Sequence, residues 1–178
     1  MEIILAENHG FCYGVKRAVE MANEAADGKG KSYTLGPIIH NPQVVDRLES
    51  KGVSPIQEVA DIDEGTMIIR SHGVGPAIYD EAEKKGLHIL DATCPHVKKA
   101  QQDAKSVIED GMTLVILGEK NHPEVKSINL WANNKGIIIE DEESAQKLQI
   151  VEKMGVVVQT TFSQFKFNSI IEILEKKS

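Results

Sequence analysis

Two stretches of this 178-residue chain align with each other without a gap at a spacing of 82 residues, and each begins with the only cysteine of its half. Between Cys12 and His40, 8 of 29 positions are identical to those 82 residues later, against roughly two expected by chance from average composition. Solenoid repeats are about 20–50 residues long, so this longer period indicates a duplicated domain. The identical residues are Cys12, Val15, Lys16, Ala18, Ala22, Leu35, Gly36 and His40, which recur as Cys94, Val97, Lys98, Ala100, Ala104, Leu117, Gly118 and His122.

The bulk composition is typical of a globular protein and argues against membrane and nucleic-acid partners. Hydrophobic residues make up 41% of the chain and charged residues 26%, and no apolar run reaches the ~18 residues of a membrane helix. The net charge of −7 disfavours nucleic acid, because that affinity comes largely from Lys and Arg neutralising phosphates. Residues 1–9 include Glu2 and Glu7 and lack the basic region of a secretory signal, which predicts a cytoplasmic location.

Hydrophobic periodicity predicts the α/β class. Short apolar runs typical of buried strands alternate with segments whose apolar residues recur at helical spacing, and this alternation indicates parallel sheets. We expect strands at 3–5, 33–35, 67–69, 88–90, 113–117, 137–139 and 156–158, and helices at 15–26, 42–51, 76–85, 97–108 and 165–176. Together with the repeat, this pattern predicts two α/β domains related by pseudo-symmetry, the first at 1–94 and the second at 95–178.

Both cysteines are candidates for chemistry. Each lies in a predicted strand-to-helix turn, where a helix N-terminus favours the thiolate that binds metal or attacks electrophiles. Cys12 is flanked by Gly10 and Gly14, and Cys94 precedes Pro95, which suits the first turn of a helix. The alternative is that each is a small buried hydrophobe, but their recurrence at equivalent turns favours a function. In a cytosolic chain such cysteines are more often free, metal-binding or catalytic than disulfide-bonded.

Three histidines lie in predicted loops beside Gly or Pro, where functional residues concentrate. His40 is followed by Asn-Pro, His122 by Pro-Glu, and His72 stands in Ser-His-Gly-Val after a predicted strand. A single loop histidine is more often a surface or capping residue. The repeat, however, pairs His40 with His122 and favours a shared role for them.

Polar residues near the second predicted domain's strand ends are further candidates. Glu124 lies two residues after His122, which suits proton transfer beside an imidazole, although a solvated glutamate at a helix start is the alternative. Gln159-Thr160-Thr161 ends the last predicted strand and could bind a ligand or cap the next helix. Because parallel sheets bind ligands at the carboxyl ends of their strands, four residues are expected along those edges: Cys12, His72, Cys94 and Thr160.

Six motifs of the chain resemble those of one enzyme family, 4-hydroxy-3-methylbut-2-enyl diphosphate reductase, and they occur in the family's order. They are H-G-F-C-x-G-V-K-R-A at 9–18, I-H-N at 39–41, S-H-G-V at 71–74, D-A-T-C-P at 91–95, H-P-E-V at 122–125 and Q-T-T at 159–161. The pattern departs from the family at Lys126-Ser127, where a glycine is usual.

The resemblance implies three related α/β domains around a central 4Fe-4S cluster, with one cysteine ligand from each domain. It implies that Cys12 and Cys94 are two of these ligands and that Glu124 is the acid that delivers a proton. The residues implied to bind substrate are His40, His72 and His122 at the diphosphate and Thr160 and Thr161 at the hydroxyl end.

The family's third domain, with the third cysteine, has no counterpart in these 178 residues, and residues 1–12 would be available to pack against it. The resemblance therefore implies that a full-length enzyme reductively dehydroxylates the allylic diphosphate to isopentenyl and dimethylallyl diphosphate. Electrons would come from an external donor protein such as ferredoxin or flavodoxin, and the chain alone would be inactive. Two other hypotheses stay open: a non-enzymatic diphosphate- or metal-binding module, and one half of a split iron–sulfur assembly.

Overall fold

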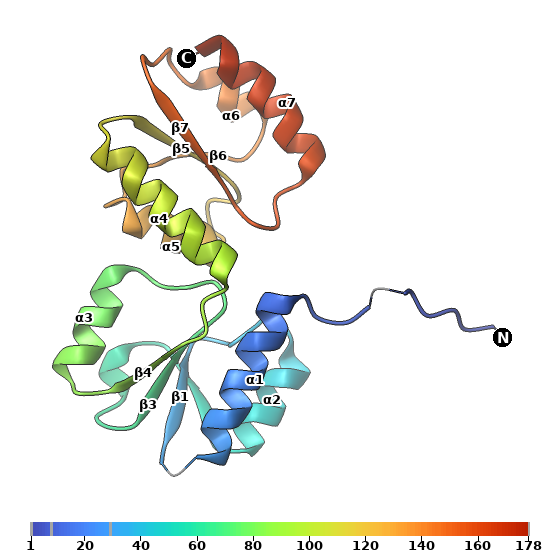
Figure 1. Ribbon diagram of the computed structural model, residues 1–178, viewed down its shortest axis with the longest axis vertical. Helices are drawn as coiled ribbons and strands as arrows, with labels where there is room; N and C mark the ends of the chain where they lie inside the picture. Colours follow the sequence, from blue (N-terminus) through green and yellow to red (C-terminus); the bar gives the residue numbers. More distant parts are fainter. Residues whose placement is uncertain (1, 8, 29, 178) are drawn as a thin grey trace. The chain divides into compact units, whose positions relative to one another are not determined.

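The computed structural model describes residues 2–7, 9–28 and 30–177 and confirms a parallel α/β fold in two compact units (Figure 1). The first unit comprises the chain up to Ser71 together with Leu87–Cys94, and the second comprises His72–Gly86 and the chain from Pro95 onward. The predicted division placed all of 1–94 in the first domain. Residues 72–86 instead group with the second unit, because hydrogen bonds from Ser127 and Trp131 hold the start of this segment.

The first unit is built on a four-stranded parallel sheet in the order β2-β1-β3-β4. Its strands are β1 (Ser32–Leu35), β2 (Val53–Ile56), β3 (Thr66–Ile69) and β4 (His88–Asp91). Its helices are α1 (Tyr13–Asp27), α2 (Pro42–Ser50) and the short 3-10 helix η1 (Val59–Asp61).

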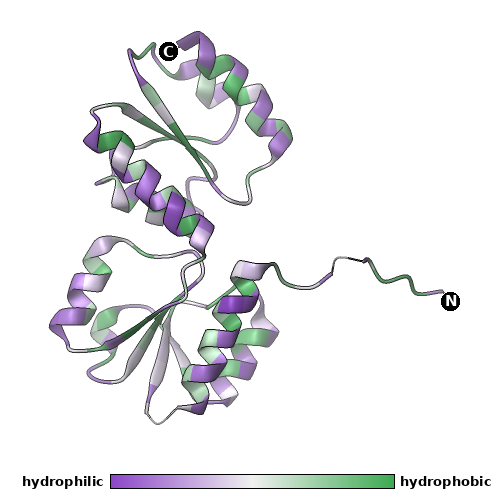
Figure 2. Cartoon of the chain, viewed as in Figure 1, coloured by the Kyte–Doolittle hydropathy of each residue, from purple (hydrophilic) through white to green (hydrophobic). Residues whose placement is uncertain are grey.

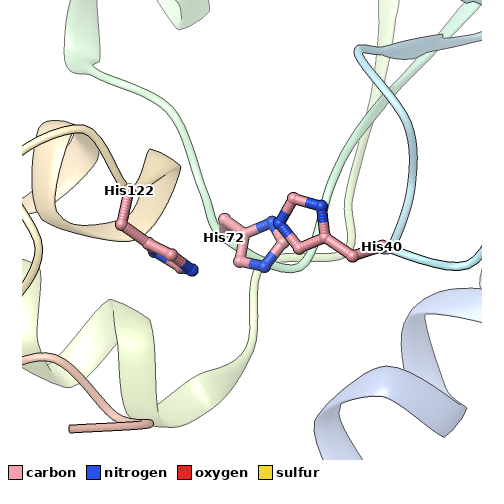
Figure 3. A group of neighbouring side chains, drawn as sticks. All are labelled: His40, His72 and His122. Carbon is pink, nitrogen blue, oxygen red and sulfur yellow. The ribbon is translucent and has the colours of Figure 1, made fainter.

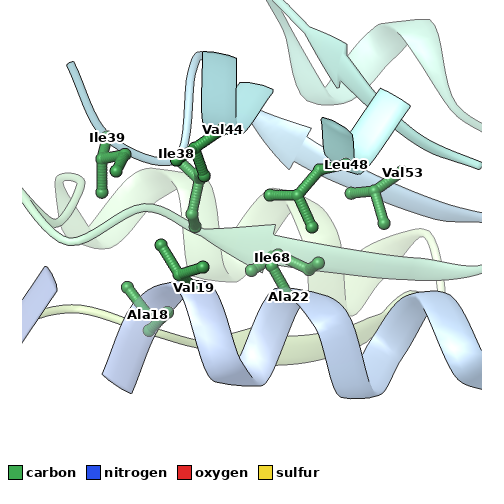
Figure 4. Packing of buried hydrophobic residues seen from close by; sticks show 10 residues of the cluster. Ala18, Val19, Ala22, Ile38, Ile39, Val44, Leu48, Val53 and Ile68 are labelled. Carbon is green, nitrogen blue, oxygen red and sulfur yellow. The ribbon is translucent and has the colours of Figure 1, made fainter. Parts of the chain in front are cut away.

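One core of the first unit lies where α1 and α2 pack against the sheet (Figure 4). From α1 it receives Ala18, Val19 and Ala22, which recur at helical spacing and are all buried. Small residues on this face allow the helix to pack closely on the sheet. The remaining buried members are Ile38, Ile39, Val44, Leu48, Val53, Ile68 and Ala92.

The second unit has a three-stranded parallel sheet in the order β6-β5-β7. Its strands are β5 (Thr113–Leu117), β6 (Ile137–Ile139) and β7 (Met154–Val158). Its helices are α3 (Pro76–Lys84), α4 (Pro95–Glu109), α5 (Pro123–Trp131), α6 (Glu142–Lys147) and α7 (Gln164–Leu174), followed by the 3-10 helix η2 (Glu175–Lys177).

Helices cover both faces of the second sheet. Leu114 and Ile116 of β5 pack with α4 and α5, whereas Val115 and Leu117 pack with α6 and α7. In Figure 2 the strands of this sheet are coloured mostly as hydrophobic, whereas its helices carry hydrophobic and hydrophilic residues side by side. A strand buried on both faces is typical of α/β proteins and explains why β5 reads as a continuous apolar run.

The two units repeat one topology. In each sheet the first strand of the repeat, β1 or β5, lies between the two strands that follow it. A shift of 82 residues maps α1 onto α4 residue for residue. The expected duplication is therefore visible as a common order of elements.

Several elements differ from the sequence prediction. Ile3, Ile4 and Leu5 form no strand, and their side chains are 75–83% exposed, so no sheet partner within the described residues covers them. Strand β2 was not predicted because Pro55 interrupts its apolar pattern, yet proline is tolerated on the edge strand that β2 forms. Helices α5 and α6 and the 3-10 helix η1 were also missed. No helix among the described residues has the length and apolarity to cross a membrane.

Candidate functional site

The two cysteines lie at helix starts and belong to the first unit. Cys12 is the N-cap of α1, in extended conformation, and Cys94 follows β4 and directly precedes α4. Both are free thiols; Cys12 is exposed and Cys94 is partly exposed. The prediction that Cys12 follows a strand is wrong, because residues 3–5 form none, whereas Cys94 does follow one.

Gly14 allows Cys94 to approach the first turn of α1. A Cβ atom placed at Gly14 would lie 2.6 Å from the Cys94 Sγ and 3.2 Å from its Cβ, far closer than carbon normally approaches. Only a hydrogen fits at this point. Gly14 is two residues from Cys12, so the fold brings the Cys94 sulfur to the helix turn that Cys12 begins.

The segment that carries Cys94 is fixed from two sides. The Cys94 backbone N–H donates to the Ser71 carbonyl at 2.9 Å, which extends the ladder beyond β3 and β4. From α1, Arg17 donates to the carbonyls of Thr93 and Asp91 at 3.3 and 3.4 Å. The Thr93 hydroxyl is buried and has no hydrogen-bond partner among the residues that the structure describes.

A guanidinium lies beside the loop that carries His40. Arg70 follows β3, and a Cβ at Gly36 would lie 2.7 Å from its Nη1. Gly36 also has a φ of +71°, which favours glycine. Burial lowers the pKa of Arg70 through desolvation, yet a guanidinium keeps its charge in proteins. The loop therefore has a fixed positive charge within a protein of negative net charge.

His40 is exposed on the loop between β1 and α2 (Figure 3). The two residues before it, Ile38 and Ile39, are buried in the core. After it, Asn41 caps α2 by accepting a hydrogen bond from the Val44 N–H at 3.2 Å. The histidine is thus held between two anchored positions on the first unit.

His72 and His122 form a ring pair within the second unit. Their ring centroids are 5.3 Å apart with the ring planes at 86°, an edge-to-face arrangement (Figure 3). His122 is the N-cap of α5, and its Nδ1 accepts a hydrogen bond from the Glu124 N–H at 3.2 Å. This bond assigns the proton of the neutral His122 ring to Nε2, which makes Nε2 a donor.

Glu124 is buried, and Thr160 donates hydrogen bonds to both of its carboxylate oxygens. Its side chain is at the start of α5 with 2% of the residue exposed, so the alternative of a solvated helix-start glutamate is wrong. Oε1 accepts from the Thr160 N–H at 2.6 Å and Oε2 from the Thr160 hydroxyl at 2.8 Å. Both carboxylate oxygens are therefore satisfied, and one of them contacts a hydroxyl that can carry a proton.

The Gln159 side chain joins the loop after β5, which leads to His122 and Glu124, to the loop after β7, which carries Thr160 and Thr161. Its Oε1 accepts from the Glu119 N–H and its Nε2 donates to the Thr161 hydroxyl, both at 2.9 Å. The alternative that Gln159 to Thr161 cap the next helix is wrong, because the N-cap of α7 is Ser163, which accepts from the Lys166 N–H. The Q-T-T segment instead organises the carboxyl end of β7.

Sequence reasoning assigned no role to several residues that hold this arrangement together. Their signal in the sequence is weak, because a polar residue inside a helix pattern is usually solvated. Only burial distinguishes them: Gln101 and Ser127 are each 3% exposed and bond to each other at 3.2 Å. Arg17 lies within the motif at 9–18, but only the structure reveals its hydrogen bonds to the Thr93 and Asp91 carbonyls.

Comparison with known proteins gives consistent matches along the chain. The family model described as LytB protein matches residues 3–178. A 4-hydroxy-3-methylbut-2-enyl diphosphate reductase of Geotalea uraniireducens is 48% identical over 172 residues, covering 97% of this chain and 61% of the relative. The same-named protein of Geobacter metallireducens is 48% identical over 178 residues, covering 99% of this chain and 63% of the relative.

Solved structures agree with this assignment. The E-1-hydroxy-2-methyl-but-2-enyl-4-diphosphate reductase of Plasmodium falciparum matches with a TM-score of 0.90 at 32% identity, covering 96% of this chain and 55% of that one. A structure of (E)-4-hydroxy-3-methyl-but-2-enyl diphosphate reductase matches with a TM-score of 0.82 at 44% identity, covering 97% of this chain and 63% of that one. The chain spans about 60% of the length of the curated relatives. It belongs to the LytB protein family.

Proposed function

We propose that this chain, in a protein of its relatives' full length, helps to reduce 4-hydroxy-3-methylbut-2-enyl diphosphate to isopentenyl and dimethylallyl diphosphate. The observation that carries the proposal is the buried Glu124 carboxylate, held on both oxygens by Thr160 beside the N-cap His122. A module that only holds a diphosphate or a metal has no need of a buried carboxylate joined to a hydroxyl. The relatives that carry this reaction in their names match nearly the whole chain.

The three loop histidines His40, His72 and His122 bind the diphosphate in this proposal. Neutral imidazoles donate one N–H each, and protonated ones donate two, so they suit an anion in an acidic protein. The bond from the Glu124 N–H to His122 Nδ1 supports this role, because it leaves Nε2 as the donor. The Arg70 charge beside the loop of His40 adds to the attraction for an anion.

Cys12 and Cys94 fit as ligands of a 4Fe-4S cluster, with the third cysteine expected from outside this chain. Thiolates are the usual ligands of such clusters, and both side chains are free thiols at helix starts. The close approach of the Cys94 sulfur to Gly14 places it near the turn that Cys12 begins. When bound, the cluster would supply electrons received from a donor protein such as ferredoxin or flavodoxin.

Glu124 supplies a proton in this proposal. Replacing the substrate's C–O bond by a C–H bond takes two electrons and two protons and releases water. The hydroxyl group leaves as water only after protonation, and Glu124 with the Thr160 hydroxyl forms a short path along which a proton can move. Thr160, together with Thr161, contacts the hydroxyl end of the substrate.

The test compares this chain with a form extended to the relatives' full length, in which we expect the third cysteine. After anaerobic reconstitution, iron and sulfide retained through gel filtration should be near-stoichiometric for the extended form and low for the chain alone. With a chemical electron donor, only the extended form should convert the allylic diphosphate. Absence of turnover in an extended form that retains its cluster would contradict the proposed reaction.

A further inference from the structure

The segment His72–Val74 is fastened to one face of α5 at two points. The Ser127 hydroxyl donates to the His72 carbonyl at 2.8 Å, and the Trp131 Nε1–H donates to the Val74 carbonyl at 2.9 Å. Ser127 and Trp131 are four residues apart and so lie on the same face of the helix, about 6 Å apart along its axis. The segment turns at Gly73, whose φ is +71°, and the carbonyls on either side of this turn each meet one of the two donors.

Further contacts make this attachment rigid. Ser127 accepts a hydrogen bond from Gln101 of α4 at 3.2 Å and also bonds to the Glu124 carbonyl at 2.9 Å. A Cβ at Gly75 would lie 2.8 Å from two carbons of Leu130, so the segment's backbone packs directly on α5. Ser127 is buried, and its single hydroxyl proton lies between the His72 and Glu124 carbonyls while its oxygen accepts from Gln101.

The same helix carries His122 as its N-cap and Glu124 in its first turn. Whatever is fastened to α5 therefore keeps a constant position relative to these two groups. We propose that Ser127 and Trp131 are positioning residues that hold His72 against His122, so that α5 acts as the common support of a two-histidine anion contact. The consequence for anion binding rests on the proposed function, whereas the ring geometry does not.

The first experiment measures this geometry without any ligand. In the 178-residue chain, NMR should show a nuclear Overhauser effect between ring protons of His72 and His122, and Ser127→Ala and Trp131→Phe should each weaken it. The exposed Ser106→Ala on α4 is the matched control and should leave it unchanged. Persistence of the full effect in both variants would overturn the proposal; if one variant fails to fold, the other decides.

The second experiment measures binding of inorganic pyrophosphate by calorimetry. Ser127→Ala should weaken it about threefold to tenfold, the range expected for one buried hydrogen bond. In the His72→Gln background the same change should have no further effect, because Ser127 acts through His72. An equal loss in both backgrounds would show a merely structural role and overturn the proposal. If His72→Gln itself leaves binding unchanged, the diphosphate role of His72 fails, and the ring measurement still decides the positioning role.

Discussion

The two units share a topology but differ at the start of the helix after their central strand. In the first unit His40 precedes the N-cap Asn41 of α2, whereas in the second His122 is itself the N-cap of α5. The residue 82 positions before Glu124 is Pro42, so the first unit has no carboxylate at this place. Duplication thus kept the scaffold and the histidine, while the helix start moved by one residue and a glutamate stands where the first unit has proline.

A second difference concerns the first turn of the long helix. Gly14 in α1 corresponds to His96 in α4. Glycine admits the Cys94 sulfur in the first unit, whereas His96 is exposed in the first turn of α4. The first unit therefore holds both thiols, whereas the second holds the His72–His122 ring pair and the buried Glu124 carboxylate. Equivalent positions in a duplicated fold can take different chemistry when a single side chain changes.

The largest effect is expected at Glu124, whose counterpart in the first unit is Pro42. In a full-length form, Glu124→Gln should lower kcat by about 10²–10⁴, the usual range for loss of a general acid, with little change in KM. His122→Ala should raise KM more than it lowers kcat. Steady-state kinetics with a chemical electron donor separates the two, and the exposed Glu119→Gln is the control.

His122→Asn refines this comparison, since asparagine is a good N-cap. It should retain the helix start that His122→Ala loses, while losing the imidazole donor. If both His122 variants have the KM of the wild type, the histidine has no substrate role. If the Glu124 and His122 variants lower kcat and raise KM to the same extent, the proposed roles of Glu124 in proton transfer and of His122 in substrate binding are contradicted.

The cores of the two units are compared at a repeated leucine. Leu117 of β5 is fully buried, whereas its counterpart Leu35 of β1 is 7% exposed. Each change to alanine should cost about 2–5 kcal/mol of unfolding free energy, with the larger loss at Leu117, because a fully enclosed side chain leaves the larger cavity. Denaturant unfolding measures both. A larger loss of unfolding free energy at Leu35 would show that the exposed fraction of the two leucines does not predict which substitution destabilises the chain more.

The close approach of the Cys94 sulfur to Gly14 can be tested by adding a methyl group at Gly14. Gly14→Ala should destabilise the chain by about 1–3 kcal/mol through overpacking against Cys94 and should slow metal uptake. Because the clash involves the Cys94 sulfur, Cys94→Ala should relieve much of the loss. Gly28→Ala at the end of α1 is the control with a smaller expected loss, since its φ of −75° accepts alanine and the nearest atom to an added Cβ is the Ala25 oxygen at 3.3 Å. Strict additivity of Gly14→Ala and Cys94→Ala in unfolding free energy would contradict the contact.

The smallest effect is expected at the N-cap of α6. Hydrogen bonds from the Ser144 backbone N–H and hydroxyl lower the pKa of the exposed Asp141 carboxyl. The stabilisation that this carboxylate gives to α6 is therefore fully present above the carboxyl pKa of the unfolded chain. It is lost as the pH falls through the lower carboxyl pKa of the folded chain. Amide exchange in α6 should increase over that range, and Asp141→Asn should remove the dependence. Asp110→Asn, outside α6, should leave the profile of α6 unchanged.

The sequence alone determined the parallel α/β class, the duplication and most elements, because buried strands and amphipathic helices leave their periods in the order of residues. Helices α1 and α4 were predicted because alanine and valine recur on one face of each. Most candidate residues were also visible, since the histidines stand in loops near Gly or Pro and both Cys94 and Thr160 follow predicted strands. Their roles as cluster and substrate ligands remain predictions.

Only the tertiary structure decided which residues meet. The bonds of Thr160 to Glu124 and the attachment of His72 to α5 depend on partners that lie far apart in the chain. Periodicity reports how a segment faces a core, but it carries no information on which distant segment supplies the matching donor. Buried hydrogen bonds are pairwise and long-range, and for that reason the supports of the site appeared only in the fold.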